Sequence, residues 1–195
     1  MKVLVLGNDP QINQINFSKL NKSVITLGVN RIWLKHIPNY FFAHDIEIFN
    51  ELKKIPEKEA HLQSTSNCFT SDWLFKNNRS APPWVRLHSR PIKNSFPDSV
   101  TTAISIYNSV LCNSTKITYY IAGVSLKWTN PSHFWKEIEY SSLNKHGENW
   151  YSPRFDRIFN NFKRLKDSKL NIISVNPNSN LNKLFRYESI ENLYS

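Results

Sequence analysis

The first thirty residues constrain the fold more than any other part of the chain. Residues 2–6, Lys-Val-Leu-Val-Leu, form a short apolar run that is typical of a strand buried on both faces of a parallel sheet. Residues 7–10, Gly-Asn-Asp-Pro, then form a turn. Gly7 permits a close backbone approach, Asp9 suits a helix N-cap and Pro10 suits the first helical position. The pattern predicts a strand, a tight turn and then a helix.

A second apolar run at residues 24–27 ends in Gly28-Val-Asn30. Two strands separated by a helix form the opening half of a nucleotide-binding sheet, so we predict a single Rossmann-like α/β domain with a mostly parallel sheet flanked by helices. Asn8 and Asn30 fall at the carboxyl ends of these strands, where such sheets bind ligands. The turn lacks the full G-x-G-x-x-G fingerprint, so an ordinary βα turn with a tolerated asparagine is the alternative.

A third polar site follows residues 39–43, which have the composition of a strand. His44 and Asp45 stand at its end, and residues 46–54 carry apolar side chains at helical spacing. Histidine titrates near neutral pH, so His44 could act as a base or a donor beside Asn8 and Asn30. A hydrogen-bonded cap is the alternative interpretation of this histidine.

The second half of the chain predicts another helix packed on the sheet, at residues 99–111. Asp98 and Ser99 can cap it, while Thr101 and Thr102 lie in its first turn, so its N–H groups and hydroxyls could form a phosphate cradle. A buried strand at residues 117–122 is expected to end at Gly123.

Three further segments complete the prediction. Residues 129–152 are polar and aromatic and are expected to form a small lid, and residues 153–166 form the last long helix. We interpret the aromatic stripe of that helix as core packing rather than a stacking platform. Residues 170–175 are the final strand. The whole chain, residues 1–195, is expected to be one domain.

Composition excludes several classes of protein. The chain has 40% hydrophobic residues, which is typical of a folded globule, but no apolar run near the roughly 20 residues that span a bilayer. Its N-terminus enters a strand directly, without a secretory signal. Cys68 and Cys112 are too few for a disulfide framework and lie in no metal-ligand spacing. We therefore predict a cytoplasmic protein without a membrane span, and the sequence leaves its oligomeric state open.

The charge balance favours a polyanionic partner. The chain has 25 Lys and Arg residues against 15 Asp and Glu, a net charge of +10. Four cationic residues in the middle of the chain stand near Trp84 and could grip nucleic-acid phosphates beside a stacking ring: Arg79, Arg86, Arg90 and Lys93. A basic loop region on a globular enzyme is the alternative.

Six short motifs together indicate a family. They are residues 2–10 (KVLVLGNDP), 28–30 (GVN), 42–45 (FAHD), 99–102 (SVTT), 120–125 (YIAGVS) and 175–179 (VNPNS). In this order, over nearly the whole chain, they resemble the bacterial sialyltransferases of glycosyltransferase family 42. The resemblance implies a Rossmann-like fold with a small lid and a CMP-sialic acid donor, used without a metal. No cofactor is then expected beyond the nucleotide sugar itself.

The resemblance also implies roles for individual positions. Asn8 and Asn30, beside Gly7, would contact the donor nucleotide, and His44, next to Asp45, stands where the family has a donor-binding asparagine. Further positions would surround the donor: Thr101 and Thr102 near its phosphate, Gly123 along the nucleotide, and Asn178 and Ser179 flanking the base.

The departures from the family pattern concern the chemistry. Lys127 replaces a phosphate-binding tyrosine and could neutralise the departing phosphate. Straight alignment puts Ser152 at the family's catalytic histidine, with His146 six positions earlier and His133 in reserve. We therefore predict His44 or His146 as the base, assisted by Lys127 and without a metal.

The predicted acceptor is a hydroxymethylated base in double-stranded DNA, as for phage enzymes that glucosylate or arabinosylate such bases. A glycan acceptor does not require a charge of +10, whereas arginines beside an aromatic could support a base turned out of the duplex. Three alternatives stay open: sialyltransferase-like transfer to a glycan or lipooligosaccharide, a non-catalytic nucleic-acid-binding module, and a pyrophosphokinase or nucleotidase on a related sheet.

Overall fold

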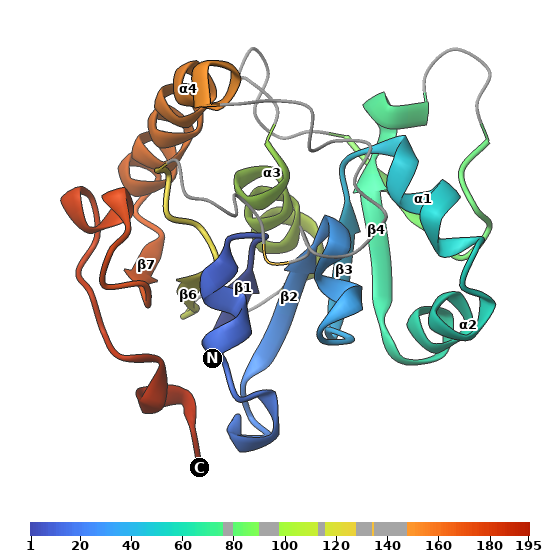
Figure 1. Cartoon of the computed structure of the whole chain (residues 1–195), viewed down its shortest axis with the longest axis horizontal. Helices are drawn as coiled ribbons and strands as arrows, with labels where there is room; N and C mark the ends of the chain where they lie inside the picture. The colour runs from blue at the N-terminus through green and yellow to red at the C-terminus, as the bar shows by residue number, and fades with distance from the viewer. Residues whose placement is uncertain (76–79, 90–97, 113–115, 128–133, 135–147) are drawn as a thin grey trace.

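A seven-stranded parallel sheet forms the centre of the protein (Figure 1). The computed structural model describes the chain apart from residues 76–79, 90–97, 113–115, 128–133 and 135–147, and without the side chains of residues 148–151. In sequence order the strands are β1 (Lys2–Leu6), β2 (Ile25–Val29), β3 (Tyr40–Ala43), β4 (Asn67–Ser71), β5 (Arg86–His88), β6 (Thr118–Ala122) and β7 (Asn171–Ser174). Every neighbouring pair in the sheet runs parallel.

The strand order, β5-β4-β3-β2-β1-β6-β7, contains one reversal of direction. From β1 the chain steps outward through β2, β3 and β4 to β5, and then returns to place β6 on the other side of β1. Val5 of β1 pairs with Leu27 of β2 on one side and Ile121 of β6 on the other. In open α/β sheets, ligands bind beyond the carboxyl ends of the strands at such a switch point.

Helices and short 3₁₀ segments cover the two faces of the sheet. On one face, α3 (Ser99–Ile106) and α4 (Glu148–Asp167) pack over alternate strand residues such as Val5 and Ile121. On the other face, α1 (Ile46–Leu52) and α2 (Pro56–Thr65) share the core with the 3₁₀ segments Pro10–Gln14 and Asn30–Leu34. Because both faces are covered, the central strands β1, β2 and β6 are largely apolar, as their sequence predicted, whereas the edge strand β5 is mostly exposed. The fold is the predicted Rossmann-like α/β architecture.

Two predicted elements differ in detail, and one helix was not predicted. Residues after the first turn form the 3₁₀ segments Pro10–Gln14 and Phe17–Lys19 instead of an α-helix, because Gln11 is held by tertiary bonds to Gly123 N and Val175 O. Helix α2 was not predicted, since Leu62 is its one buried residue and it has no apolar stripe. Helix α3 ends at Ile106, and a π-helical turn, Tyr107–Leu111, completes the predicted segment.

Two predictions can be compared only with the described part of the chain. Most of the predicted lid, residues 129–152, lies outside them, and residues 148–152 belong to α4. No helix within the described part of the chain is long and apolar enough to cross a membrane.

Candidate functional site

A pocket of about 130 Å³ lies at the switch point of the sheet. Its walls come from four places in the sequence: the turn after β1, the loop after β6, the start of α3 and the first half of α4. The lining residues are Asn8, Asp9, Asp98, Ser99, Val100, Gly123, Val124, Ser125, Leu126, Lys127, Phe155 and Ile158. Asn8, Gly123 and Lys127, which were predicted as site residues from the sequence, therefore lie in one pocket.

Two glycines let the turn after β1 and the loop after β6 meet at this pocket. Gly7 N donates to the Ala122 carbonyl at 2.9 Å, and Asp9 N donates to the Gly123 carbonyl at 2.9 Å. A Cβ on Gly7 would lie 2.3 Å from Gly123 O, and Gly123 has a φ of +66°. Both positions therefore require glycine, and Gln11 Oε1 fixes the contact by accepting from Gly123 N at 2.9 Å.

The C-terminal segment supports the loop after β6 through side-chain hydrogen bonds to its backbone. Ser179 Oγ donates to the Val124 carbonyl at 2.6 Å, and Asn180 Nδ2 donates to the Leu126 carbonyl at 2.8 Å. Ser179 is buried and Asn178 is exposed, and neither lies in the described lining of the pocket. The predicted Asn178–Ser179 turn thus acts on the pocket through the loop that it supports.

The start of α3 is occupied by a buried carboxyl group. Asp98 Oδ1 accepts from Thr101 N at 2.8 Å, and Asp98 Oδ2 accepts from Thr101 Oγ1 and, at 2.6 Å, from Asn161 Nδ2. Burial raises the pKa of Asp98, while these hydrogen bonds and the charge of His44 act in the opposite direction. The N–H and hydroxyl of Thr101 are therefore not free for a phosphate, contrary to the cradle that the sequence suggested.

The other residues in the first turn of α3 differ in whether they line the pocket. Ser99 and Val100 line the pocket, whereas Thr102 is half-buried outside that lining and donates its N–H to the Asp98 carbonyl at 3.3 Å.

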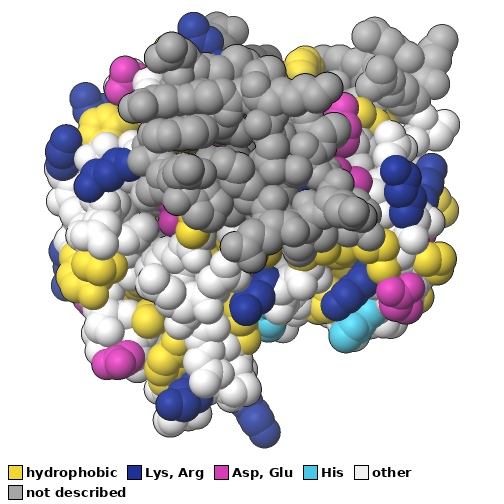
Figure 2. Space-filling model, viewed as in Figure 1, with side chains coloured by type: hydrophobic (Ala, Val, Ile, Leu, Met, Phe, Trp, Pro, Cys, Tyr) yellow, Lys and Arg dark blue, Asp and Glu magenta, His cyan; other side chains and the backbone are white. Residues whose placement is uncertain are grey.

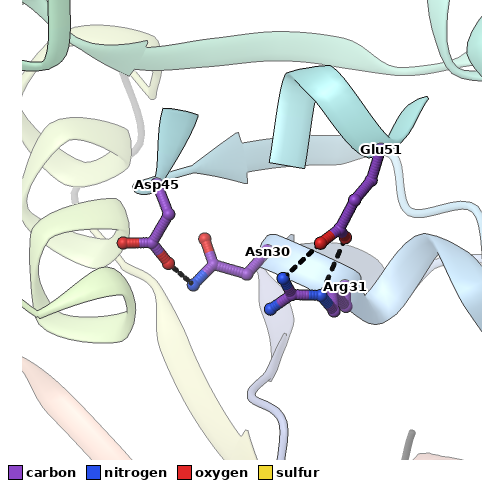
Figure 3. A network of polar contacts seen from close by, with 4 residues as sticks. All are labelled: Asn30, Arg31, Asp45 and Glu51. Carbon is purple, nitrogen blue, oxygen red and sulfur yellow. Dashed lines mark hydrogen bonds and ion pairs between the residues drawn. The ribbon is translucent and has the colours of Figure 1, made fainter. Parts of the chain in front are cut away.

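At the ends of β2 and β3 the polar residues bind one another (Figure 3). Asn30 has a φ of 51°, and its side-chain Oδ1 accepts from His44 N at 2.9 Å while its Nδ2 donates to Asp45 Oδ2 at 3.2 Å. A single asparagine therefore joins the carboxyl ends of two neighbouring strands. We call this cluster, with the ion pair described next, the β2–β3 network.

A buried ion pair extends the β2–β3 network (Figure 3). Arg31 Nε donates to Glu51 Oε2 at 2.8 Å, and Arg31 Nη2 lies 2.5 Å from Glu51 Oε1. Burial raises the pKa of Asp45; Glu47 and Glu51 add to this effect, and Arg31 opposes it. The ion pair connects the segment after β2 to α1, and none of Asn30, Arg31, Asp45 and Glu51 belongs to the described lining of the pocket.

His44 interacts with both regions: its backbone N–H donates to Asn30 in the β2–β3 network, and its charge acts on Asp98 in the pocket lining. Its ring is buried, lies 5.8 Å from the Phe42 ring and is stacked 6.4 Å from the partly exposed Trp73 ring. The charge of His44 acts on Asp98, which lines the pocket, although His44, Asn30 and Asp45 are not themselves part of that lining.

Of the predicted nucleic-acid residues, the structure describes Trp84 and Arg86. Trp84 is half-buried with its ring 6.1 Å from that of Phe49, and Arg86 is exposed on the edge strand β5. Figure 2 shows Lys and Arg side chains on several separate parts of the visible surface. Four predicted site residues lie outside the described part of the chain: Arg79, Arg90, Lys93 and His146.

Helix α4 contributes residues to the pocket and its support that were not predicted as site residues from the sequence. The stripe of α4 was interpreted as core, and Phe162 and Leu165 are indeed buried, but Phe155 and Ile158 are half-buried and line the pocket. Asn161 is 3% exposed and binds Asp98. The sequence signal for Asn161 was its place directly before Phe162, a residue of the apolar stripe that packs in the core.

The described residues contain no group of three or more His, Cys, Asp or Glu side chains placed to hold a metal ion. Asn8 contributes a different feature: its Oδ1 is buried and has no hydrogen-bond partner within the described part of the chain.

Comparison with known proteins matches the fold to one group of enzymes. No family model and no curated protein sequence matches the chain. Among solved structures, the sialyltransferase CstII from Campylobacter jejuni in complex with cytidine-5'-monophosphate has a TM-score of 0.63 at 14% identity, covering 100% of this chain and 86% of that one.

Two further structures give the same result. CST-II in complex with a trisaccharide acceptor and CMP has a TM-score of 0.63 at 13% identity, over 100% of this chain and 88% of that one. The monofunctional α-2,3-sialyltransferase Cst-I from Campylobacter jejuni has a TM-score of 0.68 at 16% identity, over 100% and 82%. The chain therefore has the fold of these sialyltransferases, and the resemblance inferred from its sequence motifs is confirmed at the level of the fold.

Proposed function

We propose that this chain is a nucleotide-sugar-dependent glycosyltransferase that binds its donor nucleotide in the pocket between β1 and β6. The observation that carries the proposal is the position of the pocket: it lies at the switch point of a sheet whose solved structural neighbours are sialyltransferases with CMP.

The lining residues can supply the contacts that such a donor needs. Asn8 offers an amide whose oxygen has no partner in the described residues, suited to a base or ribose group. Gly7 and Gly123 let the turn after β1 and the loop after β6 meet at the wall of the pocket. Lys127 is exposed and is the one cation in the described lining, so it would stabilise the charge that develops on the departing phosphate.

Donor binding is tested directly by calorimetry with CMP, UDP and GDP and by thermal shift with their sugars. A ligand at 100 times its Kd stabilises the folded protein by about 2.7 kcal/mol. We expect one nucleotide to bind wild type with micromolar affinity and to lose affinity in Asn8→Ala. Absence of binding to every nucleotide would contradict the proposed function.

The proposed base is His44 or His146. Glycosyl transfer needs a base near the acceptor hydroxyl, and alanine at that base should lower turnover by about 10²–10⁴-fold while leaving donor binding largely intact. His44 is supported by the electrostatic interaction of its ring with Asp98, a residue of the pocket lining. Wild-type turnover in the double variant His44→Ala, His146→Ala would eliminate both histidines.

For the acceptor, a saccharide hydroxyl is better supported than the DNA base favoured by the sequence. A solved neighbour carries a trisaccharide acceptor, whereas the DNA prediction is supported by net charge and by Arg86 on an exposed edge. The test incubates the protein with a soluble oligosaccharide in one arm and hydroxymethylcytosine DNA in the other, followed by mass spectrometry. A sugar adduct on the nucleoside alone would restore the DNA acceptor.

A further inference from the structure

We propose that the pocket selects a donor with an uncharged sugar and disfavours an acidic one, with Asp98 as the residue that determines this specificity. The inference rests on the proposed function and deepens it, because it names the class of sugar. It also separates this chain from its structural neighbours, since sialic acid carries a carboxylate.

The charges in the pocket give the first reason. Its described lining contains two carboxyl groups, Asp9 and Asp98, and one cation, Lys127. In the proposed function that cation stabilises the phosphate of the nucleotide sugar. A second anionic group on the sugar would then have no counter-charge in the described lining and would face carboxylates instead.

The start of α3 gives the second reason. Helix N-termini bind anions because their first N–H groups lack partners. Here Asp98 Oδ1 accepts from Thr101 N at 2.8 Å, so the chain's own carboxyl group occupies the position that a ligand carboxylate would need. Asp98 accepts a hydrogen bond from this N–H whether it is protonated or ionised. When ionised, it also repels an anionic sugar.

Asp98 cannot readily move out of the way. Its side chain is only slightly exposed, and Asn161 Nδ2 on α4 donates to its Oδ2 at 2.6 Å, which ties the carboxyl group to a second helix. Asn161 is itself 3% exposed. An acidic sugar would therefore meet a fixed carboxyl group rather than one that can turn toward solvent.

An uncharged sugar suits the same surroundings. Sugar hydroxyls are donors, and hydrogen bonds to a carboxylate are stronger than those between neutral groups. Ser99 on the pocket wall adds a hydroxyl that can donate or accept. The half-buried Phe155 and Ile158 supply apolar surface for the face of a ring.

The experiment compares ligands that differ only in the charge of the sugar. Calorimetry measures the affinity for UDP-glucose against UDP-glucuronic acid, and for CMP against CMP-sialic acid. If the wild-type pocket accepts UDP, we expect UDP-glucuronic acid to bind at least about tenfold more weakly than UDP-glucose. If it accepts CMP, we expect CMP-sialic acid to bind no more tightly than CMP.

Two substitutions test the role of Asp98. Asp98→Asn removes the charge at nearly constant shape, and Asp98→Ser keeps a helix cap with a shorter side chain, so one can fold where the other does not. We expect each folded variant to bring the acidic and neutral ligands to within about threefold of each other. Asp167→Asn is the matched control: it removes an exposed carboxylate on α4 that lies about 18 Å along the helix from Phe155, and its ligand ratio should equal that of wild type.

The outcomes separate the inference from the proposed function. Binding of CMP-sialic acid at least tenfold more tightly than CMP, or equal affinity for the glucose and glucuronate compounds, would overturn the inference while leaving a nucleotide-binding enzyme in place. An unchanged ratio in both Asp98 variants would also overturn it. Failure to bind any nucleotide would remove the proposed function and the inference with it.

Discussion

The carboxyl edge of the sheet has two halves that begin from the same kind of sequence and end differently. Beyond β1 and β6, polar residues such as Asn8 and Lys127 surround a pocket. Beyond β2 and β3, Asn30 and Asp45 bind one another, and the same region contains the buried Arg31–Glu51 pair. One half presents polar groups to a cavity, and the other half uses them to join strands.

The direction of the chain connections explains the difference. After β1 the chain packs Ile12 onto one face of the sheet, and after β6 it leads to α4, which packs Phe162 onto the opposite face. The two connections diverge and leave a space between them. After β2 and β3 both connections, with Ile32 and Ile48, pack onto the same face, so their polar residues meet.

The largest expected effect is in the half of the carboxyl edge beyond β2 and β3, which we call the closed half; the half beyond β1 and β6 is the pocket half. Arg31→Ala leaves Glu51 buried without its ion-pair partner, which typically costs about 3–5 kcal/mol. Urea denaturation should show this loss in the free energy of unfolding, while nucleotide affinity per folded molecule stays within about threefold of wild type. The double variant Arg31→Met, Glu51→Leu should recover most of the loss. A tenfold loss of affinity in folded Arg31→Ala would show that the network also shapes the pocket.

A glycine substitution on each half gives the next comparison. Gly7→Ala places a Cβ 2.3 Å from the Gly123 backbone oxygen, whereas Gly28→Ala meets side-chain atoms of Ile32 at 2.4 Å and Pro38 at 2.9 Å. Side chains can shift more easily than backbone, so we expect Gly7→Ala to cost about 2–3 kcal/mol and Gly28→Ala less. Denaturation curves of both variants test the order. Equal losses would mean that the pocket half is no more rigid than the closed half.

Lys127→Ala should change catalysis without changing stability. Loss of a cation at the departing phosphate is expected to lower kcat by about 10–100-fold, or about 1.4–2.7 kcal/mol of transition-state stabilisation. The free energy of unfolding should move by less than about 0.5 kcal/mol because the side chain is exposed. Lys127→Arg should retain most of the rate, and Lys166→Ala on exposed α4 is the control. A wild-type kcat in Lys127→Ala would remove this residue from the mechanism.

The smallest effect concerns pH and the opposite edge of the sheet, where His36 Nε2 lies 3.4 Å from Thr26 Oγ1 near the start of β2. Burial lowers the pKa of His36 from 6.5 to about 4, and its ring stacks on Phe17 at 4.4 Å. Because the folded-state pKa lies below the unfolded one, this contribution to stability is complete above pH 6.5 and is lost as the pH falls toward 4.

At pH 5.5 the loss from His36 should be about 1 kcal/mol relative to pH 7.5. His36→Phe keeps a ring against Phe17 and cannot titrate, so its free energy of unfolding should fall less than that of wild type between these two pH values. Parallel pH profiles of the two proteins would contradict the assignment.

The sequence by itself determined the local elements and their order along the chain. The apolar runs at residues 2–6, 24–27 and 117–122 predicted buried strands because a parallel sheet covered on both faces excludes polar side chains. The turn residues Gly7 and Gly123 were identified because few other residues permit such backbone geometry. These signals depend on neighbours in the sequence, so they can be read without the fold.

Only the tertiary structure decided which polar strand ends face a cavity. Asn8 and Asn30 have equivalent positions in the sequence pattern, yet one lines the pocket and the other joins two strands, because the strand order makes the chain diverge beside β1. Asp98 and Asn161 are 63 residues apart and meet through the packing of α3 against α4. The sequence predicted Asp98 as a cap of α3, but local sequence carries no information about its contact with Asn161, so that contact could be found only in the folded protein.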